Sequence, residues 1–175
     1  MLQSWYDCSW VRRPTTTMST MQKTNAIRIL ESMGISFDVA TYPVGEEHMD
    51  AVTVAGELGV DPDIVFKTLV AHDEKNGTLV FCIPGASALD MKKAAKATGS
   101  KKVDLISLKD LTPLTGYVRG GCSPIGMKKQ FPTWIDEIAS TFDRIYVNAG
   151  ARGMQVIIAP EDLVRAVGVL YADLV

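Results

Sequence analysis

The spacing of hydrophobic positions alternates along the chain between a helical period and a strand period. Residues 26–33 place apolar side chains on one helical face, and Gly34 is positioned to end that helix. Residues 35–42 then alternate apolar and more polar side chains, which predicts a strand stopped by Pro43. The regular part of the chain therefore begins with a helix followed by a strand.

The middle of the chain predicts a hairpin. Two runs rich in β-branched and aromatic residues, 66–72 and 78–84, flank Asn76-Gly77, a dipeptide that strongly favours a tight hairpin turn. We expect these runs to pair antiparallel. Further helices are expected at 52–58, at 89–97, from 107 and at 160–168, with a short helical turn at 61–62, and further strands at 103–106, 117–122, 133–136, 145–148, 154–159 and 169–172.

Hairpins and helices that follow one another without a regular βαβ repeat indicate an α+β domain. We expect a mostly antiparallel, mixed and barrel-like β-sheet flanked by helices. The length of 175 residues suits one domain, which we assign to residues 21–175. Residues 1–20 match no periodic pattern, lack the apolar stretch of a signal peptide, and are expected to form a disordered extension. An upstream start codon explains this extension better than a partner-binding tail.

Composition narrows the class of protein. A hydrophobic content of 47% and a charged content of 22% are ordinary for a globular protein, and no apolar run approaches the ~20 residues of a membrane-spanning helix. The three cysteines lie far apart, without metal-ligand spacing to one another or to the two histidines. We therefore expect a cytoplasmic protein that contacts no membrane and uses neither a metal nor a cofactor.

The net charge of −2 argues against a protein that coats DNA, because such proteins carry a large positive excess. Lysines still cluster within 92–102 and at 128–129. Clusters of this kind usually form solvated helix and turn faces, and the alternative is a local contact with phosphates.

Lys67 lies inside an apolar run, 64–71, where a strand is expected to be largely buried. An ammonium group that is buried without a partner is unstable or has a lowered pKa, so it needs a carboxylate or a polar cavity that receives a ligand. The plain alternative is a strand lysine on the solvent face. Thr68 adds a neighbouring hydroxyl group.

Residues 116–126 contain four glycines, including the pair Gly120 and Gly121. Adjacent glycines allow a ligand to approach the backbone and can direct consecutive N–H groups at one oxygen, as a carbonyl needs when it becomes an oxyanion. The alternative is a bulge and turn without a ligand.

A second turn, 148–153, offers Arg152 to a phosphate or carboxylate, although a hairpin turn with a surface arginine is the simpler interpretation.

The usual nucleophile and base pair is missing from the sequence motifs. Cys122 has no histidine near it, while His48 lies in a polar loop and His72 at a strand end. We expect Cys122 to be a packing residue.

Taken in order, several segments resemble the YbaK/EbsC family of Cys-tRNA(Pro) deacylases, which is related to the editing domain inserted in bacterial prolyl-tRNA synthetases. These segments are 66–69 (FKTL), 89–96 (LDMKKAAK), 115–126, 128–129, 132–133 and 150–153 (GARG). The resemblance extends from about residue 21 to the C-terminus. It implies an α+β fold with a cleft for the aminoacylated 3′ adenosine of a tRNA.

The resemblance also implies site residues. Lys67 matches the essential lysine of the family, Tyr42 matches the tyrosine at the end of the first strand, and Gly120 lies in the family's glycine pair. The remaining expected site residues are Gly121 as a second catalytic glycine, and Thr68, Ser123, Pro124, Asn148, Gly150, Arg152 and Gln155 as substrate contacts, with Gln155 standing where the family has an aspartate.

The missing nucleophile suits this resemblance, because an aminoacyl ester is already reactive. A site that positions it and stabilises the oxyanion needs only water, or the substrate's own thiol, as the attacking group. We hypothesise that the N–H groups of Gly120 and Gly121 hold the oxyanion. Lys67 then anchors the carbonyl or the terminal phosphate and ribose, and Tyr42 closes the pocket.

The predicted function is therefore deacylation of mischarged tRNA, with Cys-tRNA(Pro) as the expected substrate, in trans-editing during translation. The expected partners are the 3′ acceptor end of an aminoacyl-tRNA and prolyl-tRNA synthetase. Two alternatives stay open. One is a deacylase for Ala-tRNA(Pro) or other small aminoacyl-tRNAs, and the other is a noncatalytic module that binds tRNA or a synthetase.

Overall fold

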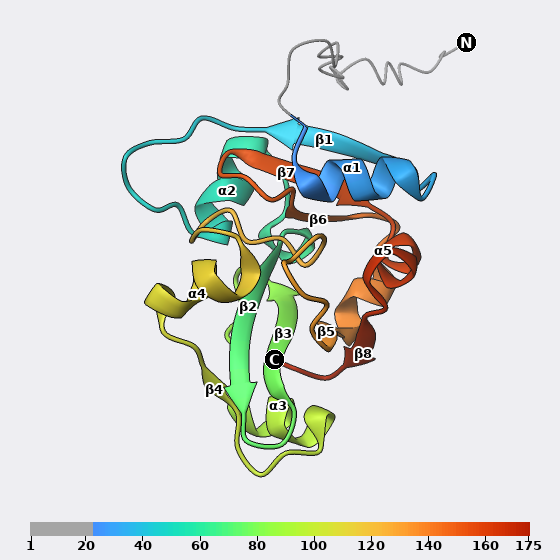
Figure 1. The fold of residues 1–175 in the computed structure, drawn as a ribbon. Helices are drawn as coiled ribbons and strands as arrows, with labels where there is room; N and C mark the ends of the chain where they lie inside the picture. The colour runs from blue at the N-terminus through green and yellow to red at the C-terminus, as the bar shows by residue number, and fades with distance from the viewer. Residues whose placement is uncertain (1–22) are drawn as a thin grey trace, which may run out of the picture.

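The computed structural model describes residues 23–175, so the extension predicted at 1–20 lies outside the described residues (Figure 1). The helices are α1 (Asn25–Ser32), α2 (Ala51–Leu58), α3 (Met91–Thr98), α4 (Leu108–Thr115) and α5 (Pro160–Val167), with 3-10 helices η1 (Pro62–Ile64) and η2 (Glu137–Thr141). The strands are β1 (Phe37–Thr41), β2 (Phe66–Asp73), β3 (Gly77–Pro84), β4 (Asp104–Leu105), β5 (Thr133–Asp136), β6 (Ile145–Asn148), β7 (Met154–Ile158) and β8 (Leu170–Ala172).

The strands form two sheets. One is antiparallel with the order β1-β7-β6, and the other is mixed with the order β4-β2-β3-β5-β8. The predicted hairpin is confirmed, because β2 and β3 pair antiparallel from Phe66 opposite Pro84 to Asp73 opposite Gly77. An isolated bridge between Val65 and Tyr146 connects the two sheets. The mixed α+β class is thus confirmed, whereas the sheets stay open and do not close into a barrel.

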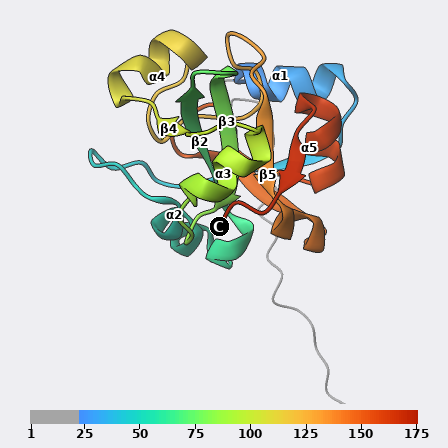
Figure 2. The same ribbon diagram turned by 90° about the horizontal axis from the view of Figure 1, so that it is seen from below.

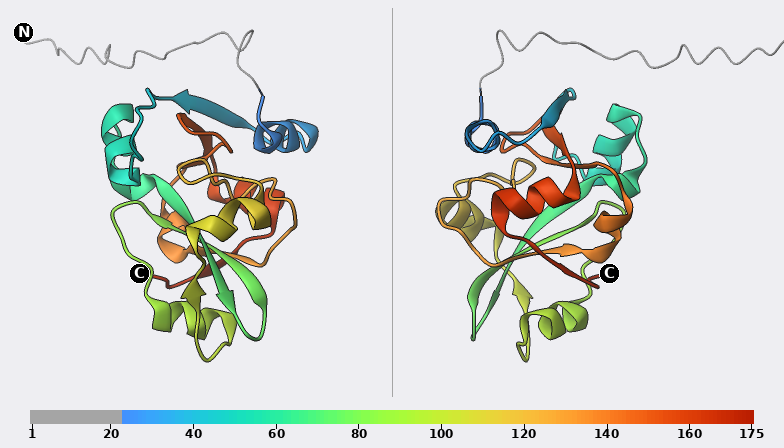
Figure 3. Two further views of the ribbon diagram at one scale, coloured as in Figure 1. Left: turned by 60° about the vertical axis from the view of Figure 1, so that its left-hand side comes forward. Right: turned by 90° about the vertical axis from the view of Figure 1, so that its right-hand side faces the viewer.

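The helices surround the long β2–β3 hairpin. α1 and α2 lie near the three-stranded sheet, while α3 lies at the opposite end of the molecule (Figures 1 and 3). Seen from below, α4 and α5 lie on opposite sides of the hairpin (Figure 2). None of the helices within residues 23–175 is long and apolar enough to cross a membrane.

Most helix ends follow from local sequence. Asp50 caps α2 by accepting a hydrogen bond from the Thr53 N–H at 2.8 Å, and Asp90 caps α3 in the same way. Gly59 and Gly99 end these two helices with φ of 66°, a left-handed conformation that glycine adopts at little cost. The predicted helices are therefore confirmed, with shifts of one or two residues at their ends.

The strand predicted at 117–122 is wrong, because this segment folds into a turn. The Gly121 N–H donates to the Val118 carbonyl at 3.0 Å, and Gly120 between them has φ of 81°. The Tyr117 hydroxyl donates to the Ile125 carbonyl at 2.6 Å. These bonds replace the partners that a neighbouring strand would supply, so the segment forms a loop packed on itself.

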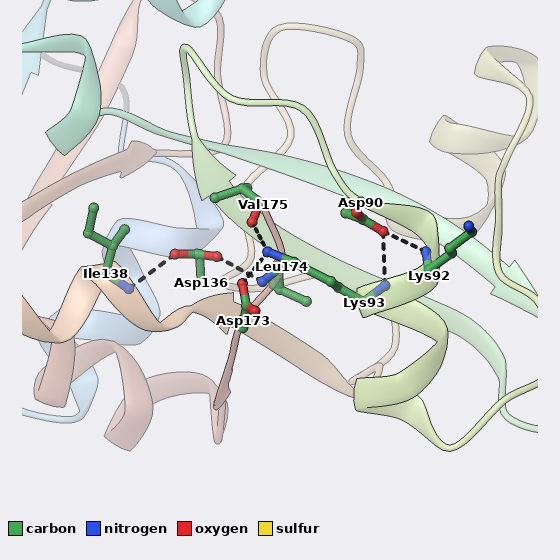
Figure 4. Close-up of polar contacts among 8 residues, drawn as sticks. All are labelled: Asp90, Lys92, Lys93, Asp136, Ile138, Asp173, Leu174 and Val175. Atoms are coloured by element: carbon green, nitrogen blue, oxygen red, sulfur yellow. Dashed lines mark hydrogen bonds and ion pairs between the residues drawn. The ribbon is translucent and has the colours of Figure 1, made fainter.

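The C-terminal segment is tied to β5 and α3 by polar contacts (Figure 4). The Asp136 carboxylate, at the end of β5, accepts hydrogen bonds from the N–H groups of Ile138 at 3.1 Å and Leu174 at 2.9 Å. From α3, the Lys93 ammonium pairs with Asp173 at 2.7 Å and donates to the main-chain oxygen of Val175. The fully buried Leu174 side chain joins the core cluster of β3 and α3.

Candidate active site

One cavity of about 590 Å³ opens where the two sheets meet. Its walls come from β2, the start of α2, the β4–α4 segment, the turn at 119–122, and the facing strands β6 and β7. This volume lies in the range of small-molecule sites. Six of the predicted site residues line it, namely Tyr42, Lys67, Thr68, Gly120, Asn148 and Gln155.

Lys67 is half-buried in the cavity wall rather than exposed on the solvent face. Its ammonium donates to the carbonyl oxygens of Gly85 at 3.1 Å and Ser87 at 2.5 Å. An ammonium has three N–H donors, so one remains for a ligand in the cavity. Burial lowers the pKa of Lys67 below its usual value, and the negative charge of Asp50 partly offsets this effect.

The loop that receives the Lys67 ammonium depends on a close approach of two chain segments. An added Cβ at Gly85 would lie 2.6 Å from the Ala51 Cβ and 2.9 Å from the Val65 carbonyl oxygen. Only glycine fits there, so the first turn of α2 packs directly against the loop. This contact places Asp50, the cap of α2, within electrostatic reach of Lys67.

Gly120 presents its backbone to the same cavity. Its φ of 81° occupies the third position of the turn from Val118 to Gly121, where a type II turn requires glycine. The Asn148 side-chain amide donates to the Gly120 carbonyl at 2.9 Å. Within residues 23–175, the Gly120 N–H has no hydrogen-bond acceptor, so it is available to an oxygen in the cavity.

Gly121 has a different place from the one predicted. It does not line the cavity, and its N–H is already bonded to the Val118 carbonyl. An added Cβ at Gly121 would lie 3.1 Å from the Arg152 backbone nitrogen. The second glycine therefore allows two turns to pack together, and its role as a second oxyanion donor stays a prediction.

Ser123, Pro124 and Gly150 also do not line the cavity. The fully buried Ser123 hydroxyl accepts a hydrogen bond from the Ile125 N–H at 3.1 Å. An added Cβ at Gly150 would lie 2.9 Å from the Tyr117 ring, so glycine allows these two loops to pack. Ser123 and Gly150 therefore support the loops behind the cavity, and the substrate contacts expected of these three residues stay a prediction.

Tyr42 and Gln155 form a polar contact at the cavity wall. The Gln155 amide nitrogen lies 3.5 Å from the Tyr42 hydroxyl, at the limit of a hydrogen bond. Its amide oxygen is the one buried side-chain polar atom among the described residues that has no hydrogen-bond partner. Buried polar atoms without a partner are costly and rare in folded proteins. Gln155 therefore places an unsatisfied polar atom in the cavity wall.

Several cavity residues were not predicted from the sequence. His48, Asp50 and Arg119 all line the cavity. Burial, followed by the positive charges of Arg119 and Arg152, lowers the pKa of His48 below its usual value, against the raising effect of Asp50. The cap position of Asp50 before α2 was readable from the sequence, whereas nothing local indicated the place of His48 or Arg119.

Arg152 lies beside the main cavity, in a small adjoining hollow shared with His48 and Gly120. Its guanidinium donates to the carbonyl oxygens of Gly45 at 3.3 Å and Glu47 at 2.9 Å. Arg152 therefore holds the loop before α2 against the turn that contains Gly120.

Cys122 is not an activated nucleophile. Burial raises the pKa of its thiol to about 12, and no hydrogen bond joins it to His48 in the described part of the chain. Cys82 is also buried, and burial raises the pKa of its thiol to about 12. The predicted packing role of Cys122 agrees with this environment.

Comparisons with known proteins define the family. Residues 46–166 match the family described as "Aminoacyl-tRNA editing domain". The chain is 47% identical over 155 residues to a protein of Enterococcus faecalis named "Putative Cys-tRNA(Pro)/Cys-tRNA(Cys) deacylase EbsC", covering 89% of this chain and 94% of that protein. It is 23% identical over 109 residues to "Uncharacterized protein YwhH" of Bacillus subtilis, covering 62% of this chain and 69% of that protein.

Solved structures agree with this result. A crystal structure described as that of "a putative trans-editing enzyme for prolyl tRNA synthetase" superposes with a TM-score of 0.76 at 25% identity, covering 88% of this chain and 98% of that chain. Lys67 and the turn that contains Gly120 line one cavity, and the Cys122 thiol in its wall is not activated. This arrangement suits hydrolysis of an ester by positioning of the substrate. The chain belongs to the aminoacyl-tRNA editing domain family, as the resemblance predicted, and is a hydrolase of the aminoacyl-tRNA ester bond.

Proposed function

We propose that this protein hydrolyses Cys-tRNA(Pro) in trans, in the cytoplasm, and so removes cysteine attached in error to the proline tRNA. The name of the Enterococcus faecalis relative supports this substrate. The observation on which the mechanism rests is that Lys67 and Gly120 line one cavity, each with an N–H donor free for a ligand.

The ester carbonyl binds between these two donors. As the carbonyl carbon is attacked, its oxygen becomes negative, and the third N–H of Lys67 and the N–H of Gly120 stabilise that charge. The two fixed carbonyls of Gly85 and Ser87 keep the ammonium in place before the reaction. Removal of such a donor typically slows an enzyme by about 100-fold to 1,000-fold.

The attacking group is water or the thiol of the substrate itself. When the thiol attacks, a sulfur–carbon bond forms, the ester carbon–oxygen bond breaks, and the thiol proton passes to the departing ribose oxygen. The product is a cyclic thioester and free tRNA. Tyr42 and Gln155 bound the pocket for the amino-acid part.

The first test compares Lys67→Ala with Lys96→Ala, a change of an exposed lysine on α3 that does not line the cavity. We expect Lys67→Ala to reduce kcat/KM on Cys-tRNA(Pro) by about 100-fold or more, with circular dichroism unchanged and Lys96→Ala fully active. Equal activity of the two variants would exclude Lys67 from the reaction. A wild-type protein that binds tRNA without releasing cysteine would instead indicate a noncatalytic module.

The second test concerns the amino acid. A pocket distinguishes substrates that differ by a methyl-sized group by roughly 1–3 kcal/mol, so we expect Cys-tRNA(Pro) to react faster than Ala-tRNA(Pro) but with overlap. Rates on both, measured in one assay, decide between these substrates. If the thiol route operates, S-methylcysteinyl-tRNA(Pro) binds but is not turned over, and unchanged turnover excludes that route.

We further propose that prolyl-tRNA synthetase assists in tRNA selection. The net charge of −2 supports this proposal, because the chain lacks the large positive excess of a protein that binds nucleic acid by itself. Pull-down of the synthetase with and without tRNA tests it. No capture in either condition would count against the partnership.

A further inference from the structure

Among residues 23–175, Arg119 is the one arginine that lines the main cavity. It precedes Gly120 in the turn, and it is exposed. Among residues 23–175 it makes no hydrogen bond and no ion pair, in contrast to Arg144 with Asp38 and Arg165 with Asp162. A guanidinium with five donors therefore stands at a cavity wall without an acceptor.

The other cations near the cavity already have acceptors. Lys67 is directed toward Gly85 and Ser87, and Arg152 toward Gly45 and Glu47. His48 is close enough to Arg119 and Arg152 that their charges lower its pKa. This side of the cavity thus has an excess of positive charge, with Asp50 as the acidic residue within electrostatic reach of His48.

We propose that Arg119 binds a phosphodiester group of the substrate, namely the phosphate on the 5′ side of the terminal adenosine, with His48 beside it. This inference rests on the proposed function. The reacting carbonyl lies at Gly120, and the 5′ phosphate of an esterified adenosine is one ribose away from that carbonyl. Arg119 is the next residue in the chain, and its long side chain spans a comparable distance from the same turn.

Arginine is better suited to binding this phosphate than lysine or histidine. Its planar guanidinium donates two parallel hydrogen bonds to phosphate oxygens, and it stays charged at every relevant pH. The arrangement separates two tasks on neighbouring residues, because Gly120 faces the ester and Arg119 holds the nucleotide. The phosphate contact then positions the ester against Lys67.

The test uses two substrates, one that lacks the phosphate and one that carries it. Cysteinyl adenosine carries the same ester without any phosphate, and Cys-tRNA(Pro) carries the full 3′ end. We expect Arg119→Gln to lower kcat/KM on Cys-tRNA(Pro) by about tenfold to 100-fold, mainly through KM. On cysteinyl adenosine, kcat/KM of the same variant should stay within about twofold of the wild-type value, which is within the error of such a comparison.

Salt dependence supplies a second readout. Neutralising one phosphate of a single strand contributes a slope of about 0.7 to the plot of log affinity against log salt. The slope for Cys-tRNA(Pro) should therefore be shallower by about that amount in Arg119→Gln. Arg119→Lys, which keeps the charge, should retain the wild-type slope and lose part of the affinity.

Arg28→Gln is the matched control, because Arg28 is an exposed arginine on α1 that does not line the cavity. It should leave both substrates unaffected. Equal losses on both substrates by Arg119→Gln, or full activity on Cys-tRNA(Pro), would overturn the phosphate contact. If wild-type protein hydrolyses neither ester, the proposed function fails, and binding of the trinucleotide CCA to wild type and Arg119→Gln still decides the subsite: equal affinity overturns it.

Discussion

Gly120 and Gly121, which are adjacent in the turn beside the cavity, have different roles. Gly120 has a positive φ, lines the cavity and makes no hydrogen bond through its N–H within residues 23–175, whereas Gly121 uses its N–H within the turn and makes room for the 151–152 backbone. A pair of glycines in a sequence therefore does not imply a pair of ligand donors. Conformation decides which N–H points to the ligand.

Gly120→Ala should reduce both stability and activity. A φ of 81° costs an alanine about 1–2 kcal/mol, and its Cβ would lie 3.2 Å from His48 Nδ1. Gly56→Ala is the control, because Gly56 lies within α2 with open space around it. There alanine should stabilise the protein by about 0.5–1 kcal/mol. Urea unfolding and deacylation rates measure both, and a fully active Gly120→Ala would contradict the role given to this backbone.

Gln155 lies in the cavity wall and lowers the stability of the folded protein. Its unpartnered amide oxygen is buried, and the whole residue is 5% exposed. Functional sites commonly retain such unfavourable groups because a ligand satisfies them.

Gln155→Met should therefore stabilise the free protein and slow the reaction. Methionine has a similar shape and no polar atom to satisfy, so the expected gain is about 1 kcal/mol. Thermal unfolding and kcat/KM on Cys-tRNA(Pro) are the measurements. A lower melting temperature would show that the weak contact with Tyr42 matters more than the unsatisfied oxygen.

At the scale of elements, α2 links helix capping to the chemistry of the site. Asp50 accepts the Thr53 N–H that caps this helix, and its charge also raises the pKa of Lys67 against the lowering effect of burial. One carboxylate thus fixes the helix start and supports the charged form of the lysine.

Asp50→Asn separates these two effects, because asparagine caps helices about as well as aspartate. In the proposed mechanism the protonated lysine is the active form, so activity should fall as pH rises through the Lys67 pKa, which burial lowers from its usual value. Loss of the Asp50 charge lowers that pKa further, so this fall should begin at a lower pH. The measurement is kcat/KM against pH, corrected for spontaneous ester hydrolysis. Asp61→Asn, at the start of η1, should leave the profile unchanged.

At the scale of the whole molecule, the cavity lies where the two sheets meet, because residues of both sheets line it. Lys67 comes from the five-stranded sheet, while Asn148 and Gln155 come from adjacent strands of the three-stranded sheet. In the C-terminal segment, Leu174 is fully buried and its N–H donates to the Asp136 carboxylate.

Leu174→Ala should destabilise the whole domain by about 2–5 kcal/mol, the usual cost of removing a fully buried leucine side chain. Val175→Ala is the control, because Val175 is 38% exposed. Denaturant unfolding measures both. An effect of Leu174→Ala no larger than that of Val175→Ala would show that the C-terminal contacts contribute little.

The order of helices and strands followed from the sequence by itself, because hydrophobic period, caps and turn residues act over a few positions. The hairpin at Asn76-Gly77 and the helix ends at Gly59 and Gly99 are examples. The wrong prediction of a strand at 117–122 has the same physical basis. Residues 117–122 combine Tyr117 and Val118, which favour strands, with two glycines, but no neighbouring strand within residues 23–175 supplies their hydrogen bonds.

The sequence also determined that Lys67 needs polar partners, since a charge in an apolar strand is unstable alone. Only the tertiary structure decided which partners it has, because Gly85, Ser87 and Asp50 reach it through chain segments distant in sequence. The same is true of Arg119 and His48, whose neighbourhood arises where separate loops converge. Local patterns determine elements, whereas the place of a side chain in a cavity depends on how those elements pack.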